Sequence, residues 1–345
     1  MKILNVMLTT GKGGLEQVFL DYNYAFKLKG IESISIIHNK SGITLDEGDN
    51  FYKVANFSKY DPFALFKLWQ ILAKEKPDLI LTHGNRAHYL MRKIASSRVV
   101  VGVSHVYSFK YITKCDYIIS VNKDMMGILE DTGYNKSRLF HIPNMLKTQE
   151  SIKYSKPALS KRPTIGLMAR LDPIKGADIF VKAISILKSR NININAMIGG
   201  EGMEYQNTKK LISDLSLEEN ITMLGWIENK EDFYSKIDIL CMPSTKETFG
   251  LVILEAFLYS KPVIISDLPG PMEIVENEEN GLVFETNNAQ DLANKIEMLI
   301  QNEGLMSKLS KQGFKDLGGY SEKEIADKIA SSFGEILKQE GEKLP

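Results

Sequence analysis

The sequence contains little cysteine and no long hydrophobic run. Cys115 and Cys241 are the only cysteines among 345 residues, too few and too far apart for a disulfide framework or a thiolate metal site. We expect both to pack as small apolar side chains. The longest apolar runs, such as 251–258, fall short of the about 20 residues that a membrane-spanning helix needs. Residues 1–8 lack a small-residue cleavage site and are typical of a first β-strand, so we expect a cytoplasmic protein.

Several nucleotide-binding and metal-binding patterns are also absent. Lys12 is followed by Gly13, where a Walker loop requires Ser or Thr, and Gly-Gly-Glu-Gly at 199–202 lacks the third glycine of the dinucleotide fingerprint. These absences argue against a kinase or a dehydrogenase. The sequence also has no Asp-x-Asp pair that would suggest a metal-bridged diphosphate. It therefore predicts no bound metal and no cofactor.

The net charge of zero conceals two halves of opposite sign. Residues 1–160 carry 22 Lys and Arg against 14 Asp and Glu, and residues 161–345 carry 21 against 29. The halves thus have net charges of +8 and −8. Such asymmetry concerns partners rather than fold. A basic first half suits a nucleic acid, an anionic membrane surface or a phosphorylated acceptor.

Short apolar runs alternate with longer amphipathic stretches, a pattern that predicts an α/β chain with parallel sheets. The polar, proline-bearing segment 147–163 is the predicted linker between two such regions. The predicted strands are 3–8, 33–38, 79–82, 99–103 and 117–121 in the first half, and 164–168, 193–198, 221–224, 237–242 and 262–266 in the second.

Two glutamates eight residues apart are the most informative feature of the second half. Glu247 precedes Thr248-Phe249-Gly250, which is typical of a loop, and Leu251 begins an apolar run with helical spacing that contains Glu255. The backbone N–H groups at such a helix start suit a bound anion. The alternative is structural, because an acid in the first turn of a helix is favoured by the helix dipole.

Two cations precede this pair by about 75 residues. The run 165–176 has the pattern of a buried strand followed by a loop that carries Arg170 and Lys175. Ligands in open α/β sheets bind outside the carboxyl ends of strands, and an arginine fork with a mobile lysine suits a diphosphate. Surface cations of this kind are often merely solvated, so the joint arrangement with the acid pair carries the interpretation.

The order and spacing of these motifs resemble glycosyltransferase family 4. The motifs that carry this resemblance are Arg170-x4-Lys175-Gly176, Gly200-Glu-Gly202, Gly225-Trp226, Glu247-x7-Glu255, residues 268–276, Asn280-Gly281-Leu282, Gly13-Gly14-x-Glu16, Thr82-His83, Gly102-Val-Ser-His105 and Ile142-Pro143-Asn144. They span almost the whole chain. The resemblance implies a retaining, nucleotide-sugar-dependent enzyme of the GT-B fold, in which two Rossmann-like domains face a central cleft.

The resemblance also implies the domain boundaries. We expect an acceptor-side domain at 1–155, a nucleotide-sugar-binding domain at 160–318, and a C-terminal helix at 320–340 that crosses back to the first domain. Ser321 and Glu324 have capping-box spacing at the start of this amphipathic segment.

By the same resemblance, Glu247 contacts the hydroxyls of the donor sugar and Glu255 those of the ribose. The remaining nucleotide-sugar-binding candidates are Gly13, Gly14, Arg170, Lys175, Phe249, Gly250 and Leu251. Arg170, Lys175 and the helix amides after Gly250 would stabilise the charge that develops on a nucleoside diphosphate leaving group. Paired carboxylates also occur in glycosidases, but a hydrolase has no need of the cation pair.

Histidines at strand ends are candidates in the first half. His105 follows the strand at 99–103 and, by the resemblance, lies beside the transferred sugar as a catalytic residue with Glu247. His83 and Glu16 are candidates on the acceptor side. A lone histidine is often only structural, and each glycine turn taken alone is often only a turn.

The acceptor is less clearly indicated. Residues 59–76 place Phe63, Phe66, Trp69 and Leu72 near one helical face with lysines around them, which suits a helix that lies on a membrane. A helix that begins at Pro62 and packs into the core is the alternative. We expect a UDP-sugar donor and a glycan or glycolipid acceptor. A second expectation is peripheral contact with an anionic membrane at the inner face of the cytoplasmic membrane. We expect no nucleic acid partner. A nucleotide-sugar 2-epimerase and a non-catalytic sugar-nucleotide or glycan-binding protein are the competing interpretations.

Overall fold

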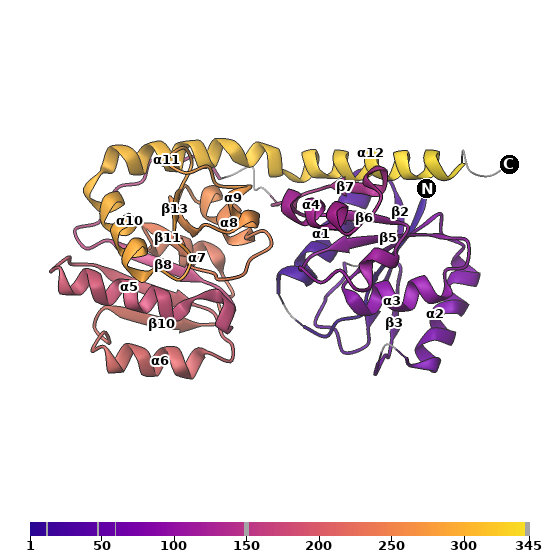
Figure 1. Cartoon of the computed structure of the whole chain (residues 1–345), viewed down its shortest axis with the longest axis horizontal. Coiled ribbons are helices and arrows are strands. Elements are labelled where there is room, and N and C mark those ends of the chain that lie inside the picture. Colours follow the sequence, from indigo (N-terminus) through magenta and orange to yellow (C-terminus); the bar gives the residue numbers. More distant parts are fainter. Residues whose placement is uncertain (12, 47, 59, 148–151, 342–345) are drawn as a thin grey trace. The chain divides into compact units, whose positions relative to one another are not determined.

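The computed structural model describes residues 1–11, 13–46, 48–58, 60–147 and 152–341. Its contacts divide the chain into two compact units (Figure 1). Unit 1 comprises Met1–Met145 together with Tyr320–Pro345, and unit 2 comprises Leu146–Gly319. Residues 148–151 of the predicted linker lie outside the described residues, as do Lys12 and Lys59.

Unit 1 is built on a seven-stranded sheet in the order β3-β2-β1-β4-β5-β6-β7. Its strands are β1 (Lys2–Met7), β2 (Glu32–His38), β3 (Phe51–Val54), β4 (Leu79–His83), β5 (Val99–Ser104), β6 (Tyr117–Ser120) and β7 (Leu139–His141). Every neighbouring pair is parallel. The carboxyl ends of all these strands therefore meet at one edge of the sheet, where α/β proteins place their ligands.

The helices of unit 1 are α1 (Gly14–Leu28), α2 (Pro62–Glu75), α3 (Asn85–Ile94), α4 (Lys123–Asp131) and α12 (Glu322–Gly341), with short 3₁₀ turns η1 (Ile112–Lys114) and η2 (Lys136–Arg138). Side chains cap several of these helices, whereas α1 and α3 begin after a glycine without a side-chain cap. The side chain of Asp61 accepts hydrogen bonds from the first amides of α2, and Pro62 occupies a position that needs no N–H donor. At the start of α12 the amide of Glu324 donates to Ser321 Oγ over 3.4 Å, in agreement with the predicted cap.

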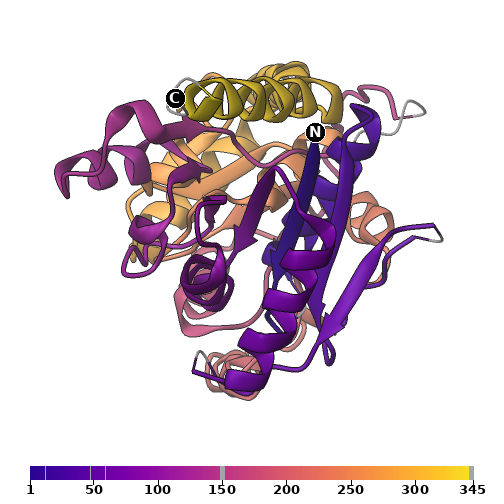
Figure 2. The ribbon, with the colours of Figure 1, turned by 90° about the vertical axis from the view of Figure 1, so that its right-hand side faces the viewer.

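The last helix returns to the first part of the chain. Helix α12 packs against α1, where the rings of Phe26 and Phe333 lie 5.9 Å apart and Lys29 pairs with Asp327. Figure 2 shows unit 1 with α12 in yellow above the indigo strands. Residues separated by almost 300 positions are therefore part of one unit.

Unit 2 is built on a six-stranded parallel sheet in the order β10-β9-β8-β11-β12-β13. Its strands are β8 (Thr164–Met168), β9 (Asn195–Gly199), β10 (Ile221–Gly225), β11 (Ile239–Met242), β12 (Val263–Ser266) and β13 (Leu282–Phe284). Its helices are α5 (Ala177–Ser189), α6 (Tyr205–Asp214), α7 (Lys230–Lys236), α8 (Leu251–Leu258), α9 (Pro269–Met272), α10 (Ala289–Gln301) and α11 (Glu303–Asp316), with the 3₁₀ turns η3 (Pro173–Lys175) and η4 (Leu317–Tyr320).

The architecture confirms the predicted α/β class with two Rossmann-like domains. The predicted strands are all present, with ends that differ by one or two residues, and β3, β7 and β13 were not predicted. Both cysteines are buried. Among the described residues, no helix combines the length and the apolar character that a bilayer crossing requires.

Candidate active site

Lys175 and Glu247 form an ion pair at the carboxyl edge of the unit 2 sheet. Lys175 ends the turn η3 that follows β8, and Glu247 lies in the loop that follows β11, the neighbouring strand. Lys175 Nζ lies 2.7 Å from Glu247 Oε2, and the two side chains are only 22% and 15% exposed. The structure thus brings together one predicted cation and one predicted acid, which the sequence separates by 72 positions.

A glycine allows these two loops to touch. Gly176 has φ of +68°, and a Cβ at this position would lie 1.9 Å from the carbonyl oxygen of Pro243. The amide of Thr245 also donates to the carbonyl of Ile174 over 2.8 Å. Only a residue without a side chain fits at position 176, and this contact fixes the backbone that carries Lys175.

The glycine motif after β9 has the same structural role. The amides of Ala169 and Leu171 donate to the carbonyls of Gly199 and Glu201, over 3.0 and 2.8 Å. Gly200 has φ of +128°, and a Cβ there would lie 1.8 Å from the carbonyl oxygen of Ala169. The motif at residues 199–202, which does not match the dinucleotide fingerprint, therefore holds the loops after β8 and β9 together.

Arg170 has a different carboxylate partner. Its Nε and Nη2 lie 2.6 and 2.5 Å from Asp172 Oδ2, and its side chain is 64% exposed. Each of the two predicted cations therefore forms its own ion pair: Lys175 pairs with Glu247, and Arg170 pairs with Asp172. The guanidinium keeps most of its surface open to solvent, so it is accessible to an anion.

Glu255 lies in a small polar cluster on α8. The helix begins at Leu251, as predicted, after Gly250 at φ of +98° and the buried Phe249. Glu255 is 7% exposed; its Oε1 accepts from Lys230 Nζ over 2.5 Å and its Oε2 from the hydroxyl of Tyr234 over 3.2 Å. Burial and the neighbouring Glu255 carboxylate raise the pKa of Tyr234 well above its ordinary value. Tyr234 therefore stays protonated and donates.

Sequence reasoning missed Lys230 and Tyr234. Helix α7 carries both, and Asn229 caps it by accepting from the amide of Glu231 over 3.0 Å. The sequence shows only that a short helix begins at Asn229-Lys230. Many solvent-exposed helices begin in this way, so the pattern does not identify Lys230 or Tyr234 as partners of Glu255.

In unit 1 the structure joins the two candidate histidines. His83 ends β4 and His105 directly follows β5, the adjacent strand. His83 Nδ1 lies 2.9 Å from His105 Nε2, and the rings are stacked with centroids 5.2 Å apart. Burial lowers the pKa of His105 to about 3, and burial together with the neighbouring His105 and His88 rings lowers the pKa of His83 well below its usual value. Both rings are neutral near pH 7.

The first glycine loop is held by an acid of α1. Helix α1 begins at Gly14, and Glu16 in its first turn accepts from Thr9 Oγ1 over 2.8 Å. Gly11 lies close to the same carboxylate, because a Cβ added to Gly11 would lie 3.1 Å from Glu16 Oε1. Gly13 and Gly14 thus lie at the carboxyl end of β1, on the edge of the sheet that also carries His83 and His105.

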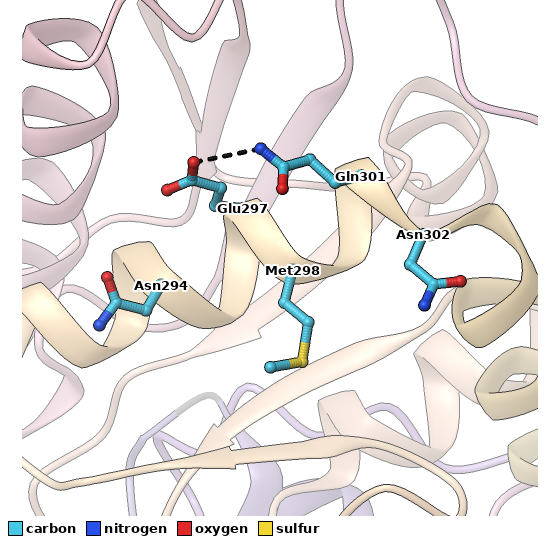
Figure 3. Close-up of a pocket in the computed structure, with 5 residues that line it drawn as sticks. All are labelled: Asn294, Glu297, Met298, Gln301 and Asn302. Carbon is cyan, nitrogen blue, oxygen red and sulfur yellow. Dashed lines mark hydrogen bonds between the residues drawn. The ribbon is translucent and has the colours of Figure 1, made fainter.

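A surface hollow lies on α10 of unit 2. Figure 3 shows its lining residues: Asn294, Glu297, Met298, Gln301 and Asn302. Glu297 Oε1 accepts from Gln301 Nε2 over 3.1 Å, and Glu297 also pairs with Arg190. The hollow contains none of the predicted site residues. Within the described residues, no three His, Cys, Asp or Glu side chains are grouped to hold a metal ion.

Comparisons with known proteins concern the family and the fold. Residues 148–316 match the family model described as glycosyl transferases group 1. An uncharacterized glycosyltransferase of Haemophilus influenzae is 26% identical over 331 residues, 88% of this chain and 92% of the relative. The lipopolysaccharide core biosynthesis glycosyltransferase LpsE of Rhizobium meliloti is 25% identical over 324 residues, 91% of this chain and 94% of the relative.

A solved structure gives the fold. The structure of HepE from Anabaena in complex with UDP superposes with a TM-score of 0.83 at 20% identity, over 97% of this chain and 100% of that one. Two Rossmann-like domains, each built on a parallel sheet, are the architecture called GT-B. Residues 148–316 match the group 1 glycosyltransferases, and both relatives are named as glycosyltransferases, which supports a glycosyltransferase.

Proposed function

We propose that the protein is a retaining glycosyltransferase that moves a sugar from a nucleotide donor, a UDP-sugar, to a glycan or lipid-linked glycan acceptor. The Lys175–Glu247 pair at the carboxyl edge of unit 2 carries this proposal, because it places a cation for a diphosphate beside an acid for sugar hydroxyls. The likeness to UDP-bound HepE supports the nucleotide. The similarity to LpsE supports a place in lipopolysaccharide or surface polysaccharide synthesis.

The groups of unit 2 have distinct roles in this proposal. Lys175, the exposed fork of Arg170 and the first amides of α8 stabilise the negative charge that grows on the leaving diphosphate. Glu247 accepts from hydroxyls of the donor sugar. Glu255, held by Lys230 and Tyr234, accepts from the ribose hydroxyls. This stabilisation needs no metal ion.

Unit 1 provides the acceptor side. His105, which directly follows β5, is the catalytic residue that lies beside the transferred sugar in this proposal. Gly13 and Gly14 let the nucleotide-sugar donor approach the start of α1, whereas His83 and Glu16, at the same edge of the sheet, are assigned to the acceptor.

Incubation with a panel of nucleotide sugars tests the reaction. We expect slow UDP release that acceptor extracts accelerate, and a product whose anomeric configuration, read by proton NMR, equals that of the donor. An altered sugar that still carries UDP would instead establish the 2-epimerase. Donor binding without any turnover would establish the sugar-nucleotide-binding protein.

We also propose that unit 1 contacts an anionic bilayer at the inner face of the cytoplasmic membrane. Helix α2 uses Ala64, Leu68, Ile71 and Leu72 for the core, whereas Phe63, Phe66 and Trp69 are 85%, 60% and 53% exposed. Phe57 and Tyr60, in the segment before the helix, are 88% and 64% exposed. Exposed aromatic side chains of this number suit the interfacial zone of a membrane. The exposed Lys53, Lys67 and Lys74 suit its negative surface.

Replacement of the exposed aromatics tests this contact. We expect F63S/F66S/W69S to weaken binding to anionic vesicles tenfold or more in sedimentation, because each aromatic side chain contributes about 1.5–3 kcal/mol when fully buried. Trp226 of unit 2, which is 55% exposed, gives a matched control, and W226S should bind like the wild type. A wild-type protein that stays in the supernatant with anionic vesicles at low salt would remove the proposal.

A further inference from the structure

Arg86 is a cation at the carboxyl edge of the unit 1 sheet. It lies in the first turn of α3, the helix that follows β4, and its side chain is partly exposed. Its Nη1 lies 3.4 Å from two carbonyl oxygens, those of Leu8 after β1 and Asn56 after β3. Both distances are long for hydrogen bonds, so these contacts hold the guanidinium only weakly. The side chain therefore lies where the ends of three parallel strands meet, and α/β proteins bind their ligands at this edge.

The charge of Arg86 has no carboxylate partner within the part of the chain that the structure describes. Helix α3 carries no acid in its first turn, and Gly84 before it provides no side-chain cap. The helix dipole opposes a cation at this end of a helix. Glu16, an acid at the same edge of the sheet, accepts instead from Thr9 Oγ1 over 2.8 Å. A bound anion would therefore be stabilised by the guanidinium and would offset the unfavourable position of this cation.

Arg86 also lies beside the exposed aromatic side chains of unit 1. Asn56, whose carbonyl contacts Arg86, is followed by Phe57, which is 88% exposed. Tyr89 lies three residues after Arg86 and therefore on the same side of α3. Its ring packs edge-on against that of Tyr60, which is 64% exposed, with centroids 5.8 Å apart. Exposed aromatic rings settle at the headgroup level of a bilayer, where the phosphates of lipids lie. A lipid held by this surface would place its phosphate near Arg86.

We propose that Arg86 binds the phosphate of a lipid-linked glycan acceptor and is a specificity-determining residue of the acceptor side. This inference rests on the proposed glycosyl transfer to such an acceptor, and it adds that a phosphate ester or diphosphate joins the sugar to the lipid. The carbonyls of Leu8 and Asn56 contact only Nη1. Nε and Nη2 contact no acceptor among the described residues, and these two donors form the edge of the guanidinium that binds two phosphate oxygens side by side.

Binding of farnesyl diphosphate to the protein saturated with UDP tests the site without any transfer of sugar. UDP occupies the anion-binding loops proposed for unit 2, so calorimetry then measures the second site alone. We expect Arg86→Gln to weaken binding about 10- to 100-fold, the usual range for hydrogen bonds to a charged group. Arg92 lies on the same helix and pairs with Asp116 over 3.4 Å, so R92Q is a matched control and should bind like the wild type. An R86Q protein that binds like the wild type would overturn the proposal.

Two further probes identify the part of the ligand that is recognised, and they require no variant to fold. Farnesol lacks the diphosphate and should bind the wild-type protein at least about tenfold more weakly. Inorganic pyrophosphate lacks the lipid and should also bind more weakly, because it buries no apolar surface on the exposed aromatic side chains. Farnesol that binds as tightly as farnesyl diphosphate would overturn the phosphate site. Pyrophosphate that binds as tightly would overturn the lipid-linked source of the phosphate.

Kinetics with two acceptors separate recognition from a structural role of Arg86. The acceptor sugar is joined to an octyl chain either directly or through a phosphate. We expect R86Q to raise KM about 10- to 100-fold for the phosphate-linked acceptor and to change KM less than about threefold for the directly linked one. Equal losses for both would show that Arg86 only holds the loops after β1 and β3, and would overturn the proposal. If the unmodified protein transfers no sugar from any donor, the proposed function fails, and the binding of farnesyl diphosphate still decides the role of Arg86.

Discussion

Lys175→Ala should lower kcat/KM for glycosyl transfer by about 10²- to 10³-fold, the usual loss when one group that stabilises a developing charge is removed. The free energy of unfolding of the K175A protein should change far less. The Lys175–Glu247 pair is partly exposed, at 22% and 15%, and such pairs contribute about 1 kcal/mol or less. We therefore expect a melting temperature close to that of the wild type. Initial rates of UDP release with acceptor, and thermal unfolding by circular dichroism, check both values.

Substitution of Glu247, the partner of Lys175, shows whether the ion pair serves activity or stability. Glu247→Ala should lose activity on the same scale, because it removes the acid proposed for the donor sugar. In K175A/E247A neither charge is left unpaired, so the melting temperature should again stay close to that of the wild type while the activity does not return. Lys182, which pairs with Asp178 at 2.8 Å on the exposed face of α5, supplies the control, and K182A should retain its rate within about twofold. Recovery of activity in the double variant would contradict the catalytic assignment.

The strands that lie inside the sheets were predictable, as was the five-residue edge strand β10, whereas the three shortest edge strands were not. Runs such as Val99–Val103 are apolar without interruption because both faces of a central parallel strand are covered. The unpredicted β3, β7 and β13 are three- or four-residue strands, each at an edge of its sheet. β3 is also half exposed, so its residues Phe51–Val54 lack the apolar pattern. Short edge strands pair through the backbone, which leaves little trace in sequence.

The candidate site was predictable where it depends on loops that follow strands. Lys175 and Glu247 follow strands β8 and β11, and these strands are neighbours in the sheet, so a cation and an acid meet. The partners of Arg170 and Glu255 were not predictable. They depend on side-chain packing, with a local acid at Asp172 and a lysine from α7 at Lys230. The His83–His105 contact likewise required the strand order, which spacing alone does not give.

Helix α2 shows a different limit. The sequence placed Phe63, Phe66, Trp69 and Leu72 near one helical face. The first three are exposed, and the rings of Phe66 and Trp69 are stacked with centroids 6.1 Å apart, but Leu72 is buried. Leu72 belongs to a second apolar face of the helix, which is part of the core cluster of unit 1. Periodicity shows that two apolar faces exist. Only packing against the rest of unit 1 decides which of them is exposed.

Gly176→Ala should destabilise unit 2 by about 3–5 kcal/mol, the combined cost of backbone strain and overpacking. The backbone at Gly176 has φ of +68°, and the added Cβ would lie 1.9 Å from the carbonyl oxygen of Pro243. Neither loop can yield easily, because the Thr245 amide already binds the Ile174 carbonyl. Hydrogen exchange read by mass spectrometry on peptides of each unit separately measures the effect. Peptides of β8, η3 and β11 should exchange faster, and those of unit 1 should change little.

A glycine in an unstrained position provides the control. Gly334 lies in the exposed interior of α12, and an added Cβ would meet nothing within 4 Å. Gly334→Ala should stabilise that helix by about 0.5–1 kcal/mol, since alanine loses less backbone entropy there. Because Gly176 also fixes the backbone of Lys175, G176A should lose transfer activity even at temperatures where unit 2 remains folded. A G176A protein with wild-type exchange and wild-type rate would show that the two loops are not in contact, and that Lys175 is held by its ion pair with Glu247 alone.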